Sequence, residues 1–552
     1  MKKIIYPISM GLCSALLALA IAPPSLYSQS GVVAADHILA SQAGAQILRQ
    51  GGNAVDAVIS TTLAAGVVQP VGSGLGGGGF AVVHKVDNAP FVLDFRERAS
   101  TKASRDMFVN QSREKASQKG GLAVAIPNEG NGLIELYKKY SSLPLSVIAK
   151  PAIELASKGF TIESHLLHAL GKLPSTEREA ISLQLWDIRN PEHGSQLKNV
   201  KLAKTIKAWA KTEGQVYKDG WVAQDIADVV QKDKGIVSLE DLEQVTPKQR
   251  EALEGMYKDW HIITMPPPSS GGLIILQILA VLEGYDLASM GHNSSELLHL
   301  YAETMKHAYA DRANYMGDPD RVEVPITRIL DTKRIEEIRS QYSPEKTQTR
   351  EYYGTPKELG TDAGTQHISV IDKNGMSVAL TSTINTEFGS MLVAPKSGIL
   401  LNNQMDDFVA KPGTANYYGL IGSEANSVAP MAVPLSSMSP TILYKDSGEQ
   451  IVVGASGGPL IISSTIQVIL NIVEFGMSPS EAVHASRIHH QWVPEKLFLD
   501  GDIPKDVRDN LEKKGHTLAS MPLQASVQVI HCSEEGCLAA SDPRKGGWPV
   551  AR

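Results

Sequence analysis

The chain has 552 residues, of which 43% are hydrophobic and 20% are charged. This is the composition of an ordinary globular protein, and the length allows either several domains or one large α/β body. The formal net charge is -7, and no segment concentrates Lys and Arg. Composition and charge therefore argue against a nucleic-acid partner.

The first 30 residues have the pattern of a secretory signal peptide. Lys2 and Lys3 form a basic start, residues 10–22 are apolar, and Ser28-Gln29-Ser30 offers small residues for cleavage. A retained membrane anchor is the alternative, but the apolar core is short for a membrane span and prolines bracket it. We expect residues 1–30 to be removed and the mature protein to be periplasmic or secreted, with no membrane attachment.

Helical and strand patterns alternate in the first part of the chain, and helices then dominate. Strands are expected at residues 80–86 and 91–95, and again from residue 365 onward. Helices are expected at residues 39–49, 53–67, 132–140, 145–158, 199–213, 221–233, 272–283, 295–315, 461–475 and 479–484. Strand-rich segments on both sides of a helix-rich middle indicate one sandwich that both halves of the chain build together.

A hairpin is predicted where the strands resume. Thr365 opens a run of alternating polar and apolar residues, and Asp372-Lys373-Asn374-Gly375 suits a type I turn followed by a left-handed Gly. With this turn, Asp372 pairs with Met376 and Thr365 pairs with Thr383. Alternation then places Thr365, Thr383 and Asn385 on one face, and an apolar set suited to a helix layer on the other. A Thr at a strand end can display a nucleophile, although this segment taken alone favours a half-exposed Thr-rich hairpin.

Two Gly-rich segments have different meanings. Residues 72–77 (Gly-Ser-Gly-Leu-Gly-Gly) resemble a dinucleotide fingerprint, but a helix precedes them and a strand follows, which is the reverse of the required order. We interpret Gly76 to Gly79 as positions of close backbone packing. Residues 452–459 (Val-Val-Gly-Ala-Ser-Gly-Gly-Pro) instead lead from a strand through glycines into a helix. Such a junction presents free N–H groups to an anion, here an acyl-transfer oxyanion, because no phosphate-binding lysine is present; a plain tight turn remains the alternative.

Three short segments supply polar groups suited to a free amino acid. Residues 402–408 carry amides and carboxylates, residues 434–440 carry hydroxyls between prolines, and Arg96 follows a strand. Each is individually more typical of a structural turn or a solvated loop. Together they offer a guanidinium for a carboxylate and acceptors for an ammonium group.

Cysteine and histidine usage argues against a metal. Removal of the signal leaves Cys532 and Cys537, which flank a four-residue turn and are predicted to form a disulfide, with two free thiols as the alternative. Two cysteines without a second ligand pair do not make a zinc site. His484, His489 and His490 lack metal-binding spacing. We expect no metal and no cofactor.

With these features together, the chain resembles the γ-glutamyltransferases (glutathione hydrolases), members of the N-terminal nucleophile hydrolase superfamily. The resemblance extends from about residue 31 to residue 544. It is carried by residues 51–57 (Gly-Gly-Asn-Ala-Val-Asp-Ala), 76–80 (Gly-Gly-Gly-Gly-Phe), 94–97 (Asp-Phe-Arg-Glu), 265–272 (Met-Pro-Pro-Pro-Ser-Ser-Gly-Gly), 402–408 and 434–440. It implies an α+β fold, a four-layer αββα sandwich built from both halves of the chain. It also implies a precursor that cuts itself between Gly364 and Thr365 into a large-subunit region (31–364) and a small-subunit region (365–552).

The resemblance also implies roles for particular residues. Thr365 matches the nucleophile and Thr383 its supporting hydroxyl, and the backbone N–H groups of Gly457 and Gly458 match the oxyanion donors. The residues that match substrate ligands are Arg96, Ser436 and Ser437 for the carboxylate, Asn385, Gln404 and Asp407 for the α-amino group, and Tyr418 in a covering loop at residues 411–422.

The implied activity transfers the γ-glutamyl group of glutathione or a related amide, through Thr365, to water or to an amino-acid or dipeptide acceptor. A related acylase of β-lactam side chains is the nearest alternative, and an uncleaved, inactive secreted binding protein is another. Gln366, residues 126–130 and Glu387 depart from the family pattern, but none of these departures removes a catalytic position.

Overall fold

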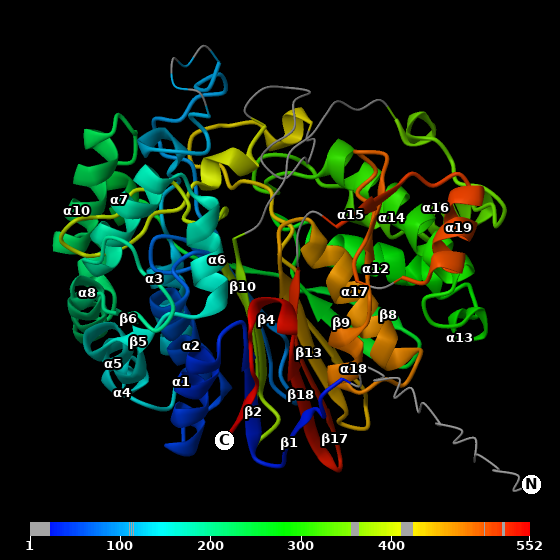
Figure 1. Cartoon of the computed structure of the whole chain (residues 1–552), viewed down its shortest axis with the longest axis horizontal. Helices are drawn as coiled ribbons and strands as arrows, with labels where there is room; N and C mark the ends of the chain where they lie inside the picture. Colours follow the sequence, from blue (N-terminus) through cyan, green and yellow to red (C-terminus); the bar gives the residue numbers. More distant parts are fainter. Residues whose placement is uncertain are drawn as a thin grey trace, which may run out of the picture.

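The computed structural model describes residues 22–109, 111, 113, 115–354, 364–409, 423–501, 503–521 and 525–552. Two antiparallel sheets lie face to face at its centre (Figure 1). Sheet 1 has the order β19 (Val550–Ala551), β2 (Gly31–Ala35), β10 (Gln366–Asp372), β11 (Ser377–Thr383), β3 (Gly78–His84), β4 (Phe91–Phe95) and β7 (Lys248–Arg250). Sheet 2 has the order β1 (Leu26–Ser28), β18 (Gly536–Ser541), β17 (Ser526–Ser533), β13 (Gln450–Ser456), β12 (Thr441–Tyr444), β9 (Trp260–Thr264) and β8 (Leu253–Tyr257).

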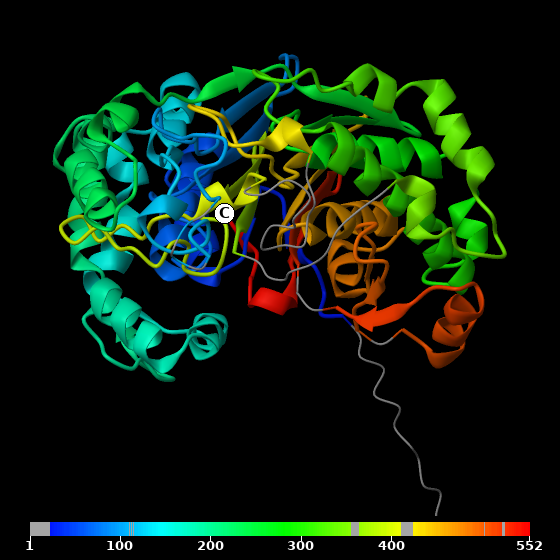
Figure 2. The same ribbon diagram turned by 90° about the horizontal axis from the view of Figure 1, so that it is seen from above.

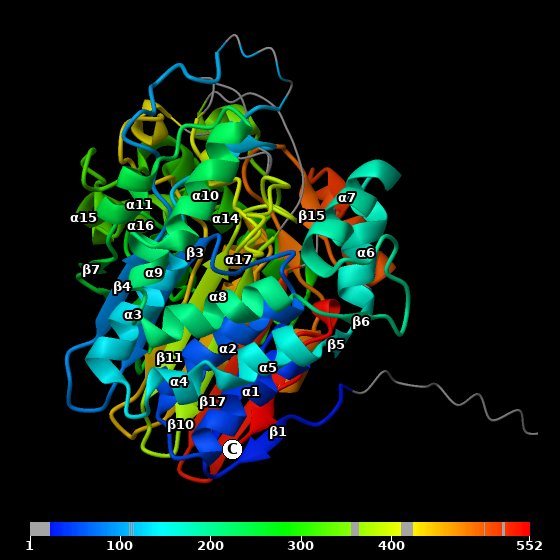
Figure 3. The same cartoon turned by 90° about the vertical axis from the view of Figure 1, so that its left-hand side faces the viewer.

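Helices cover the outer face of each sheet, which completes four layers (Figures 1 and 3). Sheet 1 is covered by α1 (Ile38–Arg49), α2 (Ala54–Val68) and α3 (Glu129–Tyr140). Sheet 2 is covered by α12 (Gly271–Leu282), α17 (Leu460–Val473) and α18 (Pro479–His484). The αββα arrangement expected from the resemblance is therefore confirmed.

The remaining elements surround this sandwich (Figure 2). On the side of sheet 1 are α4 (Leu145–Ile148), α5 (Lys150–Lys158), α6 (Ser164–Lys172), α7 (Ser175–Trp186), α8 (Val200–Lys211), α9 (Gln215–Lys218), α10 (Trp221–Lys232), α11 (Leu239–Gln244), β5 (Phe160–Thr161) and β6 (Gln196–Leu197). On the side of sheet 2 are α13 (Leu287–Met290), α14 (Ser295–Tyr315), α15 (Ile326–Ile329), α16 (Thr332–Gln341), α19 (Lys505–Lys513), β14 (Ile488–His489), β15 (Leu497–Leu499) and β16 (Leu518–Ser520). Among the described residues, no helix is both long and apolar enough to cross a bilayer.

The predicted hairpin is confirmed in register and in the direction of its faces. Gln366 pairs with Ser382 and Ile371 pairs with Ser377, so the pairing continues from the turn that was predicted. Gly375 has φ +78°, and its N–H donates to Asp372, as a type I turn followed by a left-handed Gly requires. The apolar side chains of the hairpin pack against α2 in the core between sheet 1 and its helices. They are Ile368, Val370, Met376, Val378, Leu380 and Ile384. The half-exposed interpretation is wrong, because β10 and β11 are buried throughout by sheet 2 on their other face.

The polar face of β10 is buried because its side chains bond to one another between the sheets. His367 contacts Thr381 Oγ1 at 2.8 Å and Ser369 Oγ at 3.2 Å, and Ser369 Oγ donates to the Gln528 carbonyl. A side chain at Gly454 of β13 would overlap the His367 ring, so this glycine makes room for it. Burial lowers the pKa of His367 to about 3, so the ring is neutral in this layer at neutral pH.

The structure differs from the sequence-based prediction mainly in short elements. The helix predicted at 145–158 is two helices, because the chain restarts at Lys150 with Pro151 in the first turn of α5. Strands β7 to β9 were not predicted, and they carry the chain from the edge of sheet 1 to the edge of sheet 2. Strand β1 lies inside the predicted signal segment, so cleavage after residue 30 would remove an edge strand of sheet 2.

Two carboxyl groups are buried beside the hairpin. Glu129 begins α3 and bonds to Ser382 Oγ, and Glu97 follows β4 beside Arg96. Burial raises the pKa of Glu129 to about 8, with Ser382 opposing this shift and Glu97 adding to it. Burial also raises the pKa of Glu97 to about 7, with Arg96 opposing the shift. Both groups therefore hold protons in the folded protein at pH values where they ionise in the unfolded chain.

We predict that Glu129→Gln stabilises the protein at alkaline pH. Because the pKa of the folded state is raised, the folded chain binds more protons than the unfolded chain between about pH 4.3 and pH 8, and its free energy of unfolding falls as pH rises through that window. Gln removes this loss, so Tm(variant) minus Tm(wild type) should increase by roughly 2 °C or more from pH 5 to pH 8.5. Glu135→Gln, an exposed change on the same helix, is the control. Parallel Tm curves for Glu129→Gln and wild type would contradict the prediction.

The disulfide between Cys532 and Cys537 is present, as the sequence analysis predicted, and it links paired positions of β17 and β18. We predict that Cys532→Ala/Cys537→Ala lowers the free energy of unfolding by only about 2 kcal/mol, because the closed loop is short. For a chain of this length that corresponds to about 2 °C in Tm. The bridge lies at the end of β17 where Cys532 pairs with Gln450, and the site lies at the opposite end of β13, beyond Ser456, so activity should stay within about twofold of wild type. A larger loss of activity than of stability would show that the bridge does more than hold this hairpin.

Candidate functional site

Thr365 lies at the start of β10, where the chain enters sheet 1. The side chain is buried, and its Oγ1 contacts the carbonyl oxygen of Gly364 and lies 3.1 Å from Thr383 Oγ1. Thr383 Oγ1 also lies 3.3 Å from the same carbonyl oxygen, and the Gly364 N–H donates to the Asn385 carbonyl at 3.0 Å. Both hydroxyl groups therefore contact the carbonyl oxygen of the peptide bond between Gly364 and Thr365.

Glycines bring neighbouring backbone close to this strand end. A Cβ at Gly72 would lie 3.2 Å from both the N and O atoms of Thr365, and a Cβ at Gly77 would overlap the Thr383 carbonyl. Gly76 likewise abuts the Leu400 carbonyl. The close-packing interpretation of this Gly-rich segment is confirmed. The absence of side chains at these glycines lets the two threonines pack directly against the loop that follows α2.

A charged pair lies in the pocket beside Thr365. Arg96 follows β4, is 2% exposed, and donates through Nη2 to Asp407 Oδ2 at 2.6 Å. Asp407 also accepts a bond from Gln404 Nε2 at 2.6 Å. Burial raises the pKa of Asp407, and the Arg96 guanidinium opposes that shift. The pocket therefore holds a cation and an anion side by side.

Hydroxyl and amide groups complete the lining. The pocket has about 320 Å³ of empty volume, including its open mouth. Asn385 has φ +77°, and its Nδ2 donates to the Asn403 carbonyl at 3.0 Å, so its backbone is held in the left-handed region. The lining includes the following predicted residues: Arg96, Thr365, Thr383, Asn385, Gln404, Asp407, Ser436, Ser437 and Gly458.

The junction between β13 and α17 has the predicted strand–glycine–helix order. Gly457 has φ +129° and Gly458 has φ +57°, conformations that L side chains rarely adopt. Gly458 lines the pocket, whereas Gly457 is not part of the lining and packs against Ala525. Tyr418 and the covering loop at residues 411–422 lie outside the described residues.

Sequence analysis missed Arg312, which projects from α14 into the pocket. Its Nε donates to Ser270 Oγ at 2.9 Å and its Nη2 donates to Ser437 Oγ at 3.3 Å. Burial lowers the pKa of Arg312 to about 10, which leaves it charged at neutral pH. A signal existed, because Arg312 lies on the same helix face as Tyr309 and Ala308, where an apolar residue is expected.

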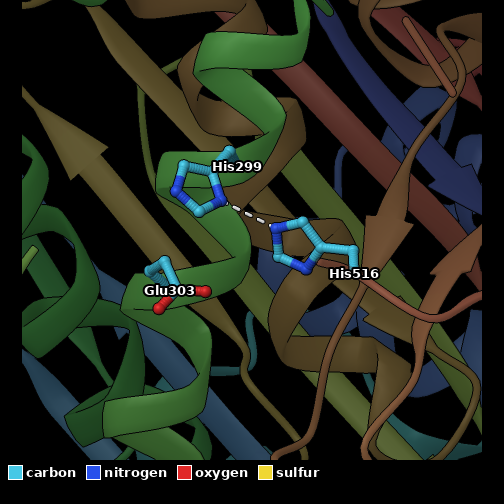
Figure 4. Close-up of side chains that lie close together, drawn as sticks. All are labelled: His299, Glu303 and His516. Atoms are coloured by element: carbon cyan, nitrogen blue, oxygen red, sulfur yellow. Dashed lines mark hydrogen bonds between the residues drawn. The ribbon is translucent and has the colours of Figure 1, made fainter. Parts of the chain in front are cut away.

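Among the described residues, His299, Glu303 and His516 form a cluster of side chains that could in principle bind a metal ion (Figure 4). His299 Nε2 donates to the Ser343 carbonyl at 2.8 Å, and its Nδ1 lies 2.7 Å from His516 Nε2. Glu303 accepts bonds from Lys306 Nζ at 2.6 Å, Thr347 Oγ1 at 2.6 Å and Tyr353 Oη at 3.0 Å. A metal would have to displace these bonds and lie beside the Lys306 ammonium, so we assign the cluster a structural role.

Sequence comparisons agree with the geometry over nearly the whole chain. The glutathione hydrolase proenzyme of Escherichia coli K12 is 38% identical, covering 97% of this chain and 96% of that protein. Glutathione hydrolase 2 of Arabidopsis thaliana is 36% identical, covering 95% and 94%.

Two solved structures of enzymes are similar to this chain. The cephalosporin acylase of Bacillus halodurans superposes with a TM-score of 0.84 at 25% identity, covering 96% of this chain and 97% of that one. The gamma-glutamyltranspeptidase of Helicobacter pylori has a TM-score of 0.55 at 34% identity, covering 59% of this chain and 94% of that one. The family model described as Gamma-glutamyltranspeptidase matches residues 40–551, and these residues contain both sheets apart from strands β1 and β2. The chain therefore belongs to the gamma-glutamyltranspeptidase family, because the match has this extent and the site has a strand-end threonine with a paired Arg and Asp beside it.

Proposed function

We propose that this protein is a γ-glutamyltransferase and glutathione hydrolase that cuts itself between Gly364 and Thr365 and then uses Thr365 as its nucleophile. The observation that carries the proposal is the position of Thr365 Oγ1, against the carbonyl of Gly364 and 3.1 Å from Thr383 Oγ1. Relatives named glutathione hydrolase proenzyme support both the activity and the processing.

Self-cleavage follows from this geometry. Thr365 Oγ1 attacks the Gly364 carbonyl carbon, an ester bond forms, the Gly364–Thr365 amide bond breaks, and the Thr365 nitrogen takes the proton that the hydroxyl loses. Water then hydrolyses the ester, which releases the Gly364 carboxylate and regenerates the hydroxyl. The new α-amino group has an ordinary pKa of about 7.7–8.0, which suits a general base near neutral pH.

The charged pair in the pocket suits the α-amino acid end of a γ-glutamyl group. Arg96, with Ser436 and Ser437 nearby, would bind the α-carboxylate, and Asp407, Gln404 and Asn385 would bind the α-ammonium. A zwitterion replaces the Arg96–Asp407 pair with two pairs, so neither buried charge is left uncompensated.

Acyl transfer proceeds in two steps on Thr365. The α-amine takes the Thr365 proton while Oγ1 attacks the γ-amide carbonyl, and the N–H groups of Gly457 and Gly458 stabilise the oxyanion. The leaving amine departs with a proton, and water or the amino group of an acceptor releases the γ-glutamyl group. The position of Gly458 in the pocket lining and the positive φ angles at both glycines support this assignment, because such a turn suits an anion.

An acylase of β-lactam side chains is a second candidate, because the cephalosporin acylase of Bacillus halodurans has the same fold over 96% of this chain. The lining of the pocket favours the γ-glutamyl substrate. Arg96, Asp407 and Arg312 contribute three charges there, which suit a zwitterionic group, whereas an apolar acyl group would make no charged contact with them.

The location of the protein is proposed from the sequence pattern of its first 30 residues, which favours export to the periplasm or medium. The Cys532–Cys537 disulfide supports an oxidising compartment.

The covering role of Tyr418 also remains a prediction.

The test of function is an assay with γ-glutamyl-p-nitroanilide, with and without glycylglycine, on wild type and Thr365→Ala. We expect wild type to release nitroaniline, to release it faster with the acceptor, and to run as two bands on denaturing gels. Thr365→Ala removes the attacking hydroxyl, so it should remain one band of full length and be inactive. A cleaved or active Thr365→Ala protein would refute the nucleophile assignment. Hydrolysis of a β-lactam side-chain amide with no γ-glutamyl activity would favour the acylase.

Arg96→Ala and Asp407→Ala should mainly weaken substrate binding. Each leaves the opposite charge buried without its partner, and loss of such a pair typically costs several kcal/mol. We expect kcat/KM for γ-glutamyl-p-nitroanilide to fall at least 100-fold, while gels show whether processing persists. Arg105→Ala, which removes an exposed pair with Glu424, is the matched control and should stay within twofold. Values of kcat/KM within about twofold of wild type for both pocket variants would show that these residues do not bind substrate.

A further inference from the structure

A buried ammonium group connects the nucleophile to the opposite sheet. Lys545, the last residue of the 3-10 turn Pro543–Lys545, is 6% exposed. Its Nζ donates to the Thr365 carbonyl at 3.1 Å and to Ser456 Oγ at 2.8 Å. Thr365 directly precedes β10 of sheet 1, and Ser456 ends β13 of sheet 2, directly before Gly457. One side chain therefore touches both the nucleophilic residue and the strand that leads into the predicted oxyanion turn.

We propose that Lys545 is a positioning residue for acyl transfer, which holds Thr365 in register with the Gly457–Gly458 turn. This inference rests on the proposed function, and it adds a residue to which sequence analysis assigned no role. The two halves of the catalytic geometry lie on different sheets, and the Lys545 bonds tie their ends together at one point.

The turn that carries Lys545 is itself fixed by a charged network. Asp542 caps it by accepting from the Arg544 N–H, and pairs with Arg487 at 2.6 Å and with Arg544 at 3.0 Å. Arg544 also pairs with Asp500. Because the backbone of the turn is anchored on both sides, the Lys545 stem is directed into the layer between the sheets rather than toward solvent.

Asp36 supplies the opposite charge. It is fully buried, accepts from the His367 N–H at 3.2 Å, and accepts from Ser526 Oγ at 2.7 Å and Gln528 Nε2 at 2.6 Å. Burial raises the pKa of Asp36, and the Lys545 charge opposes that shift. Lys545 also acts on His165 of α6, whose pKa burial lowers to about 3. His165 and His367 are therefore neutral near pH 7, so neither adds a charge beside Thr365.

The Lys545 charge has a consequence after cleavage, because the new α-amine belongs to the residue that Lys545 contacts. Lys545 donates to Thr365 itself, whereas Asp36 contacts the chain two residues further on. The cation is therefore nearer, and it disfavours protonation of the amine. At an effective dielectric constant of about 20, a charge roughly 5 Å away changes a pKa by more than one unit before Asp36 offsets part of it. The base would then be free at neutral pH.

The test compares Lys545→Met, Lys545→Arg and wild type, with the exposed Lys496→Met as control. We would measure kcat and KM for γ-glutamyl-p-nitroanilide from pH 5.5 to pH 10, with gels for processing and Tm for stability. For Lys545→Met we expect kcat to fall about tenfold or more with KM within twofold, because the nucleophile is displaced and substrate contacts are not. The acid limb of kcat should move up by about one pH unit. Lys545→Arg keeps the charge and should restore the limb to its wild-type position, and Lys496→Met should match wild type.

A purely structural lysine would lower Tm without moving the pH limb, so an unshifted limb in an active Lys545→Met protein overturns the inference. If Lys545→Met is not processed, Ser456→Ala decides: it removes only the bond to β13, and kcat should fall about threefold with KM and the limb unchanged. Unchanged kcat in Ser456→Ala would then overturn the inference. Inactive wild type would refute the proposed function, whereas active wild type with an unaltered Lys545→Met refutes only the role of Lys545.

Discussion

The antiparallel pairing of β10 with β11 is the constraint on which the rest of the site depends. It places Thr383 opposite Thr365 and so fixes two hydroxyl groups beside one peptide bond. A slip of one residue would turn the polar face toward α2 and the apolar face toward sheet 2. The apolar contacts with α2 on one side and the His367 network on the other both oppose that slip. Core packing therefore sets the position of the nucleophile, and no loop needs to close for the two threonines to meet.

The layer between the sheets is unusual because it is partly polar. Buried polar groups are expensive unless they bond to one another, and here His367, Thr381, Ser369 and Gln528 do so. Such a network has few alternative arrangements, so it specifies how the sheets stack more tightly than apolar contacts would. The site lies at the end of this layer, where β10 and β13 both terminate, and it inherits that rigidity.

Much of the fold and of the site could be predicted from sequence, for reasons that differ between residues. The hairpin was predictable because Asp372 and Gly375 determine the turn, and the turn determines the register through to Thr365. Strands β7 to β9 were not, because they are short, β7 and β8 are partly exposed, and β7 and β9 also pair with strands that are distant in sequence. Arg312 and Lys545 were not predicted, for a related reason. The sequence around each of them indicates only the local helix or turn, and it does not indicate which distant residues the side chain contacts.

The unpredicted residues share a physical feature, which is a cation buried with hydroxyl and carbonyl partners rather than in a simple ion pair. Arg312 bonds to Ser270 and Ser437, and Lys545 bonds to Ser456 and to the Thr365 carbonyl. Hydroxyl and carbonyl partners do not neutralise a cation, so part of its field persists even though Asp407 opposes the Arg312 charge and Asp36 opposes the Lys545 charge. The two cations come from different elements: Arg312 reaches the pocket from α14, and Lys545 reaches the Thr365 carbonyl from the C-terminal turn. Both favour negative charge near Thr365, which is the charge that develops when a hydroxyl attacks an amide carbonyl.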